Sequence, residues 1–351
     1  LVTPLSVLAG IVTVFRFGIL AKNGLALERF SKVDTIVFDK TGTLTIGEPK
    51  IVGIQSIDKK HNEVDIIRMA GITEKRSGHI LAKAILSEAT ARNIIIPDPD
   101  SFSSVHGHGV EAKYKGEQYY LGNKHYLEGK EHGNIIMKDL PTCIDGNGLH
   151  TSFYLACGKN LCGMICVSDQ IRSDAKLTVN NLKKRGIKNL ILLSGDRKEV
   201  VEKVASSLGI PKAYGEVFPE QKLQMIKKLH KEGHRVAMVG DGINDAVALK
   251  RADVGIAMGA MGMEPAIEAS DIALMSNDLS KIVFTYDVSK QVLRTVKQNI
   301  IIGLGFTHGL GMILALLHLL NPIQAAFFHA VPDILILLNS ARLLRLKPPQ
   351  T

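Results

Sequence analysis

A short apolar run, residues 35–38, ends in the carboxylate of Asp39 and a loop of small hydroxylated residues, and this stretch constrains the fold more than any other. An apolar run of this length bounded by a turn indicates a buried parallel strand. Asp39 would then follow the carboxyl end of the strand, where open α/β sheets bind ligands. Lys40, Thr41 and Thr43 lie beside it in the sequence. A carboxylate in such a loop can attack a phosphoryl group and become an aspartyl phosphate, although these residue types are also common in ordinary turns.

Five further apolar runs have the composition of strands and alternate with charged segments that are typical of helices. This alternation predicts a doubly wound α/β fold with a parallel sheet. The pattern stops at about residue 49 and resumes at about residue 162, so we expect an inserted α+β domain between them. The five runs are residues 164–167, 190–193, 236–239, 254–257 and 272–274.

Carboxylates follow several of these runs, as Asp39 follows the first. Asp196, Asp241 and Asp245 each come just after a predicted strand. Because the carboxyl ends of parallel strands meet at one edge of a sheet, we expect these side chains to converge. A group of acidic side chains needs a cation, and Mg²⁺ suits carboxylates, carbonyls, water and phosphate. Lys222, at the start of a predicted helix, could neutralise a phosphoryl group there, while a turn or surface role stays open for each residue.

The overall composition narrows the class of partner. A net charge of +9 over 351 residues comes without long basic blocks, and the chain has no Trp and only 5% aromatic residues. These features argue against nucleic acid as a partner. The four cysteines lack the tight spacing of zinc motifs, so we expect buried reduced thiols rather than a metal site, and a cytoplasmic setting. They are Cys143, Cys157, Cys162 and Cys166.

Two parts of the chain are apolar enough to enter a lipid bilayer. Residues 1–20 carry one charge, Arg16, and are expected to end a membrane helix, with a buried core helix as the alternative. Residues 300–332 contain no Asp, Glu, Lys or Arg, and Asn321–Pro322 divides the tail into two spans of about 20 residues each. Basic residues flank both ends of the tail, so the positive-inside rule places these ends and the catalytic residues in the cytoplasm.

Polar side chains within a membrane segment are costly and usually functional. His329 and Asp333 lie four residues apart, on one face of the predicted last helix. The spacing suits two ligands of one divalent cation, with a helix–helix hydrogen bond as the alternative. Imidazole and carboxylate favour Zn²⁺, Co²⁺, Ni²⁺ or Mn²⁺ over Cu⁺.

Three separated motifs resemble one family. Asp-Lys-Thr-Gly-Thr-Leu-Thr at 39–45 matches the phosphorylation motif of heavy-metal-transporting P-type ATPases. Ser-Gly-Asp at 194–196 is similar to the family's Thr-Gly-Asp motif, and Gly-Asp-Gly-Ile-Asn-Asp at 240–245 to its Mg²⁺-binding hinge motif. The chain therefore resembles the carboxyl-terminal half of such an ATPase over nearly all its length.

The resemblance implies a haloacid dehalogenase-like phosphorylation domain that is split by a nucleotide-binding domain and followed by transmembrane helices. The expected parts are the end of a transmembrane helix at 1–22, the phosphorylation domain at 30–48 and 162–280, the nucleotide-binding domain at 49–161, a linking helix at 281–298, and transmembrane helices at 299–320 and 322–345.

The resemblance also implies residue roles. Asp39 would accept the γ-phosphate of ATP. The catalytic residues would be Asp39, Lys40, Thr41, Asp196 and Lys222, and the nucleotide-binding residues would be Thr43, Glu74, His79, Gly107 and Gly109. Mg²⁺ would be held by Asp39, Thr41, Asp241 and Asp245.

The expected activity is ATP-driven transport of a divalent metal, most simply export, by a multi-pass protein of the cell membrane. The chain is expected to be a fragment without the family's actuator domain and earlier membrane helices. A membrane-tethered phosphatase of the same fold is one alternative, and a nucleotide-binding module without turnover is another. Phosphatases of this fold usually carry a second Asp two residues after the nucleophile, where this chain has Thr41, which favours a persistent phosphoenzyme. The chain also departs from the family at residues 77–80, where Ser-Gly-His-Ile replaces the usual Ser-Glu-His-Pro, and at Val247, where Pro is usual.

Overall fold

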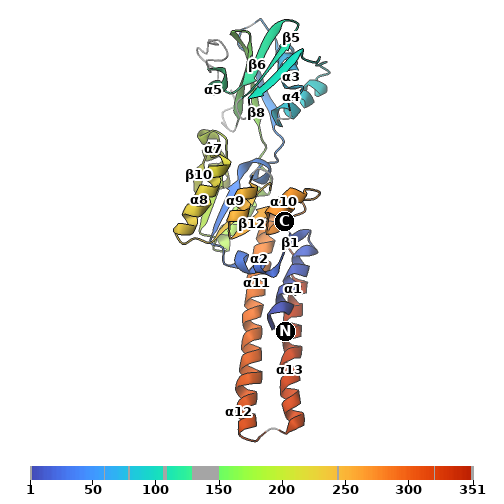
Figure 1. Ribbon diagram of the computed structural model, residues 1–351, viewed down its shortest axis with the longest axis vertical. Coiled ribbons are helices and arrows are strands. Elements are labelled where there is room, and N and C mark those ends of the chain that lie inside the picture. Colours follow the sequence, from blue (N-terminus) through green and yellow to red (C-terminus); the bar gives the residue numbers. More distant parts are fainter. Residues whose placement is uncertain are drawn as a thin grey trace. The chain divides into compact units, whose positions relative to one another are not determined.

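The computed structural model describes residues 2–58, 60–77, 80–105, 109–128, 150–242, 245–319 and 321–348 (Figure 1). The chain divides into two compact units. The first comprises Leu1–Leu44, Arg172–Asp196 and Ala205–Thr351, and the second comprises Thr45–Ile171 and Arg197–Val204.

The first unit contains a seven-stranded sheet in the order β1-β13-β12-β11-β2-β9-β10. Neighbouring strands are parallel except β1, which is antiparallel to β13. Strand β2 therefore lies between β11 and β9, and all five of its residues are buried. The doubly wound α/β prediction is confirmed. The strands are β1 (Ile19–Ala21), β2 (Thr35–Asp39), β9 (Asn189–Leu193), β10 (Lys212–Tyr214), β11 (Val236–Gly240), β12 (Val254–Ala257) and β13 (Ile272–Leu274).

Helices α8 and α9 cover one face of this sheet. Val37 and Met238 from the strands pack in one buried cluster with Ile226 of α8 and Leu249 of α9. The connecting helices of the unit are α2 (Gly24–Ser31), α6 (Ala175–Lys184), α8 (Pro219–Lys231), α9 (Ala246–Arg251) and α10 (Glu264–Ala269). Helix α7 (Lys198–Leu208) is divided, since Arg197–Val204 belongs to the second unit.

The second unit contains a six-stranded antiparallel sheet in the order β3-β8-β7-β6-β5-β4. The strands are β3 (Lys50–Ser56), β4 (Ser101–Val105), β5 (Gly109–Tyr114), β6 (Glu117–Gly122), β7 (Thr151–Cys157) and β8 (Asn160–Ser168), and the helices are α3 (Glu63–Glu74), α4 (Ile80–Ala91) and α5 (Lys124–Leu127).

The expected return to the parallel sheet at residue 162 is wrong. Strand β8, which contains the apolar run 164–167, pairs with β3 and β7 of the antiparallel sheet, and the second unit continues to Ile171. Ile165 and Val167 face one buried cluster while Met164 and Cys166 face another. A strand that is buried on both faces has the continuous apolar sequence typical of parallel sheets, which explains the misassignment.

The expectation of reduced thiols is also corrected for one pair of cysteines. Cys157 and Cys162 form a disulfide. They lie on either side of the tight β7–β8 connection, where Cys157 is opposite Asn160. Antiparallel pairing brings the two side chains together without the short spacing of a zinc motif.

Two apolar helices of the first unit, α1 (Val2–Phe15) and α13 (Pro322–Ala341), pack with the long helix α11 (Ser280–Ile302). Helix α1 contacts both α11 and α13. A buried polar cluster joins them, since Nδ2 of Asn299 donates to Oγ of Ser6 at 3.0 Å and to Oγ of Ser340 at 2.9 Å. Beyond α11 the chain continues through a π-helical segment, η3 (Gly303–Leu310), to α12 (Gly311–Leu316), and beyond α13 through the 3₁₀ turn η4 (Arg342–Arg345).

Among the described residues, one helical stretch, Ala326–Arg345, is long and apolar enough to cross a membrane, and the apolar helix Pro4–Phe15 is shorter. The expected span at 299–320 stays a prediction. Helix α11 is also joined to the sheet domain, because the guanidinium of Arg185 donates to both carboxylate oxygens of Asp287, at 2.6 and 2.7 Å.

Candidate active site at the carboxyl edge of the parallel sheet

The loop after β2 presents Asp39 at the carboxyl end of the central strand. Gly42 in this loop has a φ of +73°, a conformation that favours glycine. Arg172 fixes the loop, since its Nε donates to the carbonyl of Thr43 at 2.9 Å and its Nη2 to the carbonyl of Gly42 at 3.2 Å. Sequence reasoning did not assign this role to Arg172, because a cation that binds backbone carbonyls leaves no pattern of paired charges in the sequence.

Lys222 joins Asp39 to a second carboxylate. It lies in the first turn of α8, which begins at Pro219 with its fixed backbone angle. Its Nζ contacts Oδ1 of Asp39 at 2.5 Å and Oδ1 of Asp245 at 2.7 Å, and all three residues are buried. The predicted convergence of these residues is therefore present in the structure as a buried ion-pair network.

This network perturbs the acidity of all three groups. Burial raises the pKa of Asp39 to about 7, and the charge of Asp245 adds to the rise against the opposing effect of Lys222. Burial likewise raises the pKa of Asp245, although Lys222 opposes it. Burial lowers the pKa of Lys222, but the charges of Asp39 and Asp245 outweigh it and raise this pKa overall. The lysine is held as a cation between two carboxylates that resist joint ionisation.

A second ion pair links the neighbouring loops. Lys40, directly after Asp39, pairs with Oδ2 of Asp196, which follows β9. The backbone N–H of Asp196 donates to Oγ of Ser194 at 3.1 Å, so the loop after β9 is closed on itself. The Asp196 side chain is 30% exposed and faces the open side of the sheet edge.

The residues that could hold Mg²⁺ present oxygen donors of the right chemistry. A Cβ on Gly42 would lie 3.7 Å from Cβ of Asp241, which places the Asp39 loop beside the loop after β11. Among the described residues, the buried Oδ2 of Asp245 has no hydrogen-bond partner, and a cation would satisfy it. Asp245 already binds Lys222 through Oδ1, so it can orient that lysine as well as contribute to the metal site.

Two of the predicted site residues near this loop differ in accessibility. Thr41 is exposed, whereas Thr43 is fully buried. Oγ1 of Thr43 has no hydrogen-bond partner among the described residues. Thr41 is therefore more accessible to a bound nucleotide than Thr43 is.

Of the predicted nucleotide-binding residues, Glu74 and Gly109 lie in the second unit and Thr43 lies in the first. Glu74 ends α3 and is 2% exposed, and burial raises the pKa of its carboxyl against a hydrogen bond from Ser77. Its Oε2 has no partner among the described residues, which suits a carboxyl group that receives a ligand. Gly109 begins β5, and a Cβ there would lie 2.7 Å from the carbonyl oxygen of Leu121, so close packing already requires glycine. His79 and Gly107 lie outside the described residues.

The predicted transport ligands lie on α13. His329 and Asp333 are four residues apart on this helix, and Pro332 interrupts its hydrogen bonding between them. Asp333 is exposed, and the side chain of His329 lies outside the described part of the chain. Their joint action on a metal stays a prediction.

A family model for haloacid dehalogenase-like hydrolases matches residues 33–253. The chain belongs to this family. The match covers β2 through β11, including Asp39, Lys222 and the two acidic loops that face them.

Within this family, the chain resembles metal-transporting P-type ATPases. It is 34% identical over 345 residues to the manganese-exporting P-type ATPase of Mycobacterium tuberculosis, covering 98% of this chain and 48% of that protein. It is 34% identical over 352 residues to a probable cadmium-transporting ATPase of Staphylococcus aureus, with the same coverage. A crystal structure of a zinc-transporting PIB-type ATPase in the E2·Pi state matches 98% of the chain and 55% of its own length, with 30% identity and a TM-score of 0.74.

These matches confirm the resemblance that three motifs had indicated and the haloacid dehalogenase-like fold of the phosphorylation domain. The chain spans about half the length of the curated relatives it matches.

Proposed function

We propose that the protein carrying this chain is an ATP-driven transporter of a divalent metal that is phosphorylated on Asp39. The observation that carries the proposal is the contact of Lys222 with Asp39 and Asp245 at the carboxyl edge of the sheet. This network places a nucleophilic carboxylate beside a fixed cation, which is what transfer of a phosphoryl group to an aspartate requires.

Residues of this chain would perform distinct parts of the reaction. Lys222 would neutralise the oxygens of the transferred phosphoryl group, and the Lys40–Asp196 pair would hold the loops that enclose it. Mg²⁺, held by Asp39, the Thr41 carbonyl and Asp241, with Asp245 behind them, would supply further positive charge for the phosphate oxygens.

The nucleotide would bind in the second unit. Glu74 supports this assignment, because it is a buried carboxyl group with an oxygen that lacks a partner among the described residues. His79, Gly107 and Gly109 complete the nucleotide-binding set proposed for this stretch of the chain, and a role for Thr43 stays a prediction.

A persistent phosphoenzyme distinguishes this proposal from a phosphatase. Thr41 stands two residues after Asp39 and cannot act as the carboxylic acid and base that rapid hydrolysis uses. Energy stored in the acyl phosphate can then drive a conformational change. The bidentate contact between Arg185 and Asp287 offers a rigid connection from the sheet domain to the long helix α11.

The cargo would be a divalent transition metal, exported through a multi-pass protein of the cell membrane with its catalytic domains in the cytoplasm. The relatives that the chain matches are named for manganese, cadmium and zinc. His329 and Asp333 offer an imidazole and a carboxylate, which bind such ions, and Zn²⁺, Mn²⁺, Co²⁺ and Ni²⁺ fit them better than Cu⁺.

The test uses the full-length protein that carries this chain, purified in detergent and incubated with Mg²⁺ and ATP labelled on the γ-phosphate. Zn²⁺, Mn²⁺, Cd²⁺, Co²⁺, Ni²⁺ and Cu⁺ are added one at a time. We expect acid-stable, hydroxylamine-sensitive label that depends on one or more divalent ions.

Two variants at opposite ends of β2 make the result specific. Asp39→Asn should abolish the label, whereas Asp34→Asn, at the residue just before this strand, should keep it. Label that persists in Asp39→Asn, or steady release of phosphate from small phosphomonoesters with no labelled protein, would contradict the proposal.

A further inference from the structure

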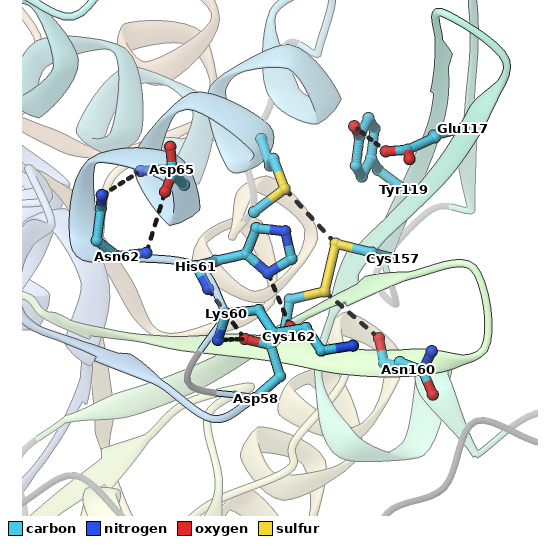
Figure 2. Close-up of polar contacts among 11 residues, drawn as sticks. Asp58, Lys60, His61, Asn62, Asp65, Glu117, Tyr119, Cys157, Asn160 and Cys162 are labelled. Carbon is cyan, nitrogen blue, oxygen red and sulfur yellow. Dashed lines mark hydrogen bonds and ion pairs between the residues drawn. A yellow bond between two sulfur atoms is a disulfide. The ribbon is translucent and has the colours of Figure 1, made fainter.

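Three potential metal ligands converge in the second unit, away from the residues assigned to ATP. Asp58 and His61 lie between β3 and α3, and Cys162 lies at the start of β8. One ligand atom from each lies within 4.8 Å of the others. Figure 2 shows one nitrogen of the His61 ring directed at the carboxylate of Asp58, with the sulfur atoms of Cys157 and Cys162 to one side of this pair.

The backbone holds the two contributing segments together. The N–H of Ile57 donates to the carbonyl of Cys162 at 2.9 Å, which joins the segment after β3 to β8. Oδ1 of Asp58 accepts hydrogen bonds from the N–H groups of Lys60 and His61, at 3.0 and 3.3 Å. The convergence is therefore built into two hydrogen-bonded segments and does not depend on long, mobile side chains.

A carboxylate orients the imidazole. Oδ2 of Asp58 lies 2.7 Å from Nδ1 of His61. A carboxylate that accepts a proton from one ring nitrogen leaves the other nitrogen as a metal ligand, an arrangement that recurs in zinc sites.

Cys157 and Cys162 bring two sulfur atoms close to the Asp58–His61 pair. Cys162 is bonded to Cys157, whose Sγ lies 3.5 Å from Sδ of Met69. Two equivalents of a monothiol such as glutathione would reduce this disulfide. Two electrons and two protons pass to the Cys157 and Cys162 sulfurs, and the monothiol leaves as its own disulfide. A cytoplasmic unit is exposed to such thiols.

We propose that Cys157, Cys162 and His61 form a second metal site, with Asp58 orienting the imidazole, in the reduced protein only, for a thiolate-binding divalent ion such as Zn²⁺ or Cd²⁺. Two thiolates and an imidazole, with water in the fourth position, are a ligand set found at tetrahedral Zn²⁺ sites. Binding displaces the two thiol protons to solvent. In the oxidised protein the two sulfur atoms are bonded to each other and neither can become a thiolate, so the site does not form.

Other histidine–aspartate pairs lack this sulfur. His230 lies 2.9 Å from Asp253 with the same ring-to-carboxylate contact. Among the described residues, the Asp58–His61–Cys162 group is the one in which at least three such side chains approach closely enough to share an ion. His230→Gln is therefore a matched control for His61→Gln.

The test titrates Cd²⁺ into the 351-residue chain in detergent and follows the ultraviolet charge-transfer band of cadmium thiolate. Chain reduced with a phosphine, which does not bind as a thiol, should give one equivalent of bound Cd²⁺ with the band. Chain oxidised with diamide should give no band. Cys162→Ser should abolish it, and His61→Gln should weaken Cd²⁺ binding by about tenfold or more.

His230→Gln and Cys166→Ser should behave as the unsubstituted chain. A band that is unchanged by His61→Gln, or that survives oxidation, or that is lost equally in Cys166→Ser, would overturn the site. Asp39→Asn should keep the band, so failure of the metal site and failure of phosphorylation on Asp39 give separate results. His61 is partly exposed, so its substitution tests the site without disturbing the core.

Discussion

Replacing Asp39 with asparagine should stabilise the metal-free protein at alkaline pH, although the proposed activity depends on this residue. Burial and the charge of Asp245 raise the pKa of Asp39 from 3.8 to about 7 in the folded protein. A carboxyl group whose pKa is higher in the folded state destabilises the fold progressively as the pH rises from the unfolded pKa through the folded pKa. Asparagine resembles the neutral carboxyl group and removes this effect.

The size of the effect follows from the difference in pKa. About three pKa units, at 1.36 kcal/mol per unit, give a stabilisation of about 4 kcal/mol at pH 8, where Asp39 is ionised in both the folded and the unfolded protein. At pH 5 the carboxyl group is protonated in the folded protein, and the same relation gives a stabilisation of less than about 2 kcal/mol. Asparagine also keeps an oxygen that can accept a hydrogen bond from Lys222, whose contact with Asp245 is unaffected. Metal-free Asp39→Asn should therefore be more stable than the unsubstituted chain, and more so at pH 8 than at pH 5.

The assay is the thermal midpoint of the chain in detergent with a chelator, followed by circular dichroism because the chain has no Trp. We expect a rise of about 5 °C or more at pH 8 that shrinks at pH 5. Added Mg²⁺ should raise the midpoint of the unsubstituted chain more than that of Asp39→Asn.

Asp34→Asn is the matched control, because folding shifts the pKa of Asp34 in the opposite direction to that of Asp39. Burial raises the pKa of Asp34, but hydrogen bonds from Thr35, Arg235 and His234 outweigh it, and the pKa is lowered overall. Its stabilising contribution is present above the unfolded pKa and is lost as the pH falls through the folded pKa, so this variant should lower the midpoint at pH 8. A midpoint of Asp39→Asn that falls at pH 8, or rises equally at both pH values, would refute the electrostatic reasoning.

Three further substitutions test the surrounding structure. Lys222→Met should lower the free energy of unfolding by about 3–5 kcal/mol and abolish phosphorylation, because it leaves two buried carboxylates without their shared cation. Calorimetry measures the first effect and labelling the second. A variant as stable as the unsubstituted chain would contradict the ion-pair network. Gly242→Ala should lower the free energy of unfolding by about 1–3 kcal/mol in the same melting assay, since the φ of Gly242 is +83° and the added Cβ would lie 2.4 Å from Cβ of Ala266. Gly116→Ala is the control, with a φ of +85° and open space around the added Cβ, and should destabilise less. Asn299→Leu should lower the midpoint through the loss of its buried hydrogen bonds, by about 1–2 kcal/mol, and an unchanged midpoint would show that these bonds contribute little to helix packing.

The sequence predicts the parallel sheet and the convergence of its acidic loops because both follow from local pattern. Apolar runs such as 35–38 and 236–239 form neighbouring strands β2 and β11. Parallel strands place their carboxyl ends at one edge, so residues that are far apart in the sequence meet without any knowledge of the loops between them. This argument brings Asp39 and Asp245 together, whereas Lys222 was predicted separately from its place at the start of a helix.

Features that depend on tertiary pairing could not be predicted in the same way. Strand β8 has the continuous apolar sequence of a parallel strand, yet it pairs in the antiparallel sheet, since both of its faces are covered. The proximity of His61 to Cys162 depends on β3 and β8 being neighbours, although they are separated by about a hundred residues. Strand β10 has three residues, too few for a periodic signal.

The electrostatics of the site connect metal binding to the reactivity of Asp39. With a pKa of about 7 in the metal-free protein, this carboxyl group is protonated about half of the time at neutral pH, and a protonated carboxyl group is a poor nucleophile. Lys222 alone does not restore the ordinary pKa, because its single charge is shared with Asp245. A further cation at the same edge lowers the pKa of Asp39, so ionisation of the nucleophile and arrival of the cation favour each other. If Asp39 is the phosphorylated residue proposed above, the buried aspartate pair would reduce its reactivity until a cation binds beside it.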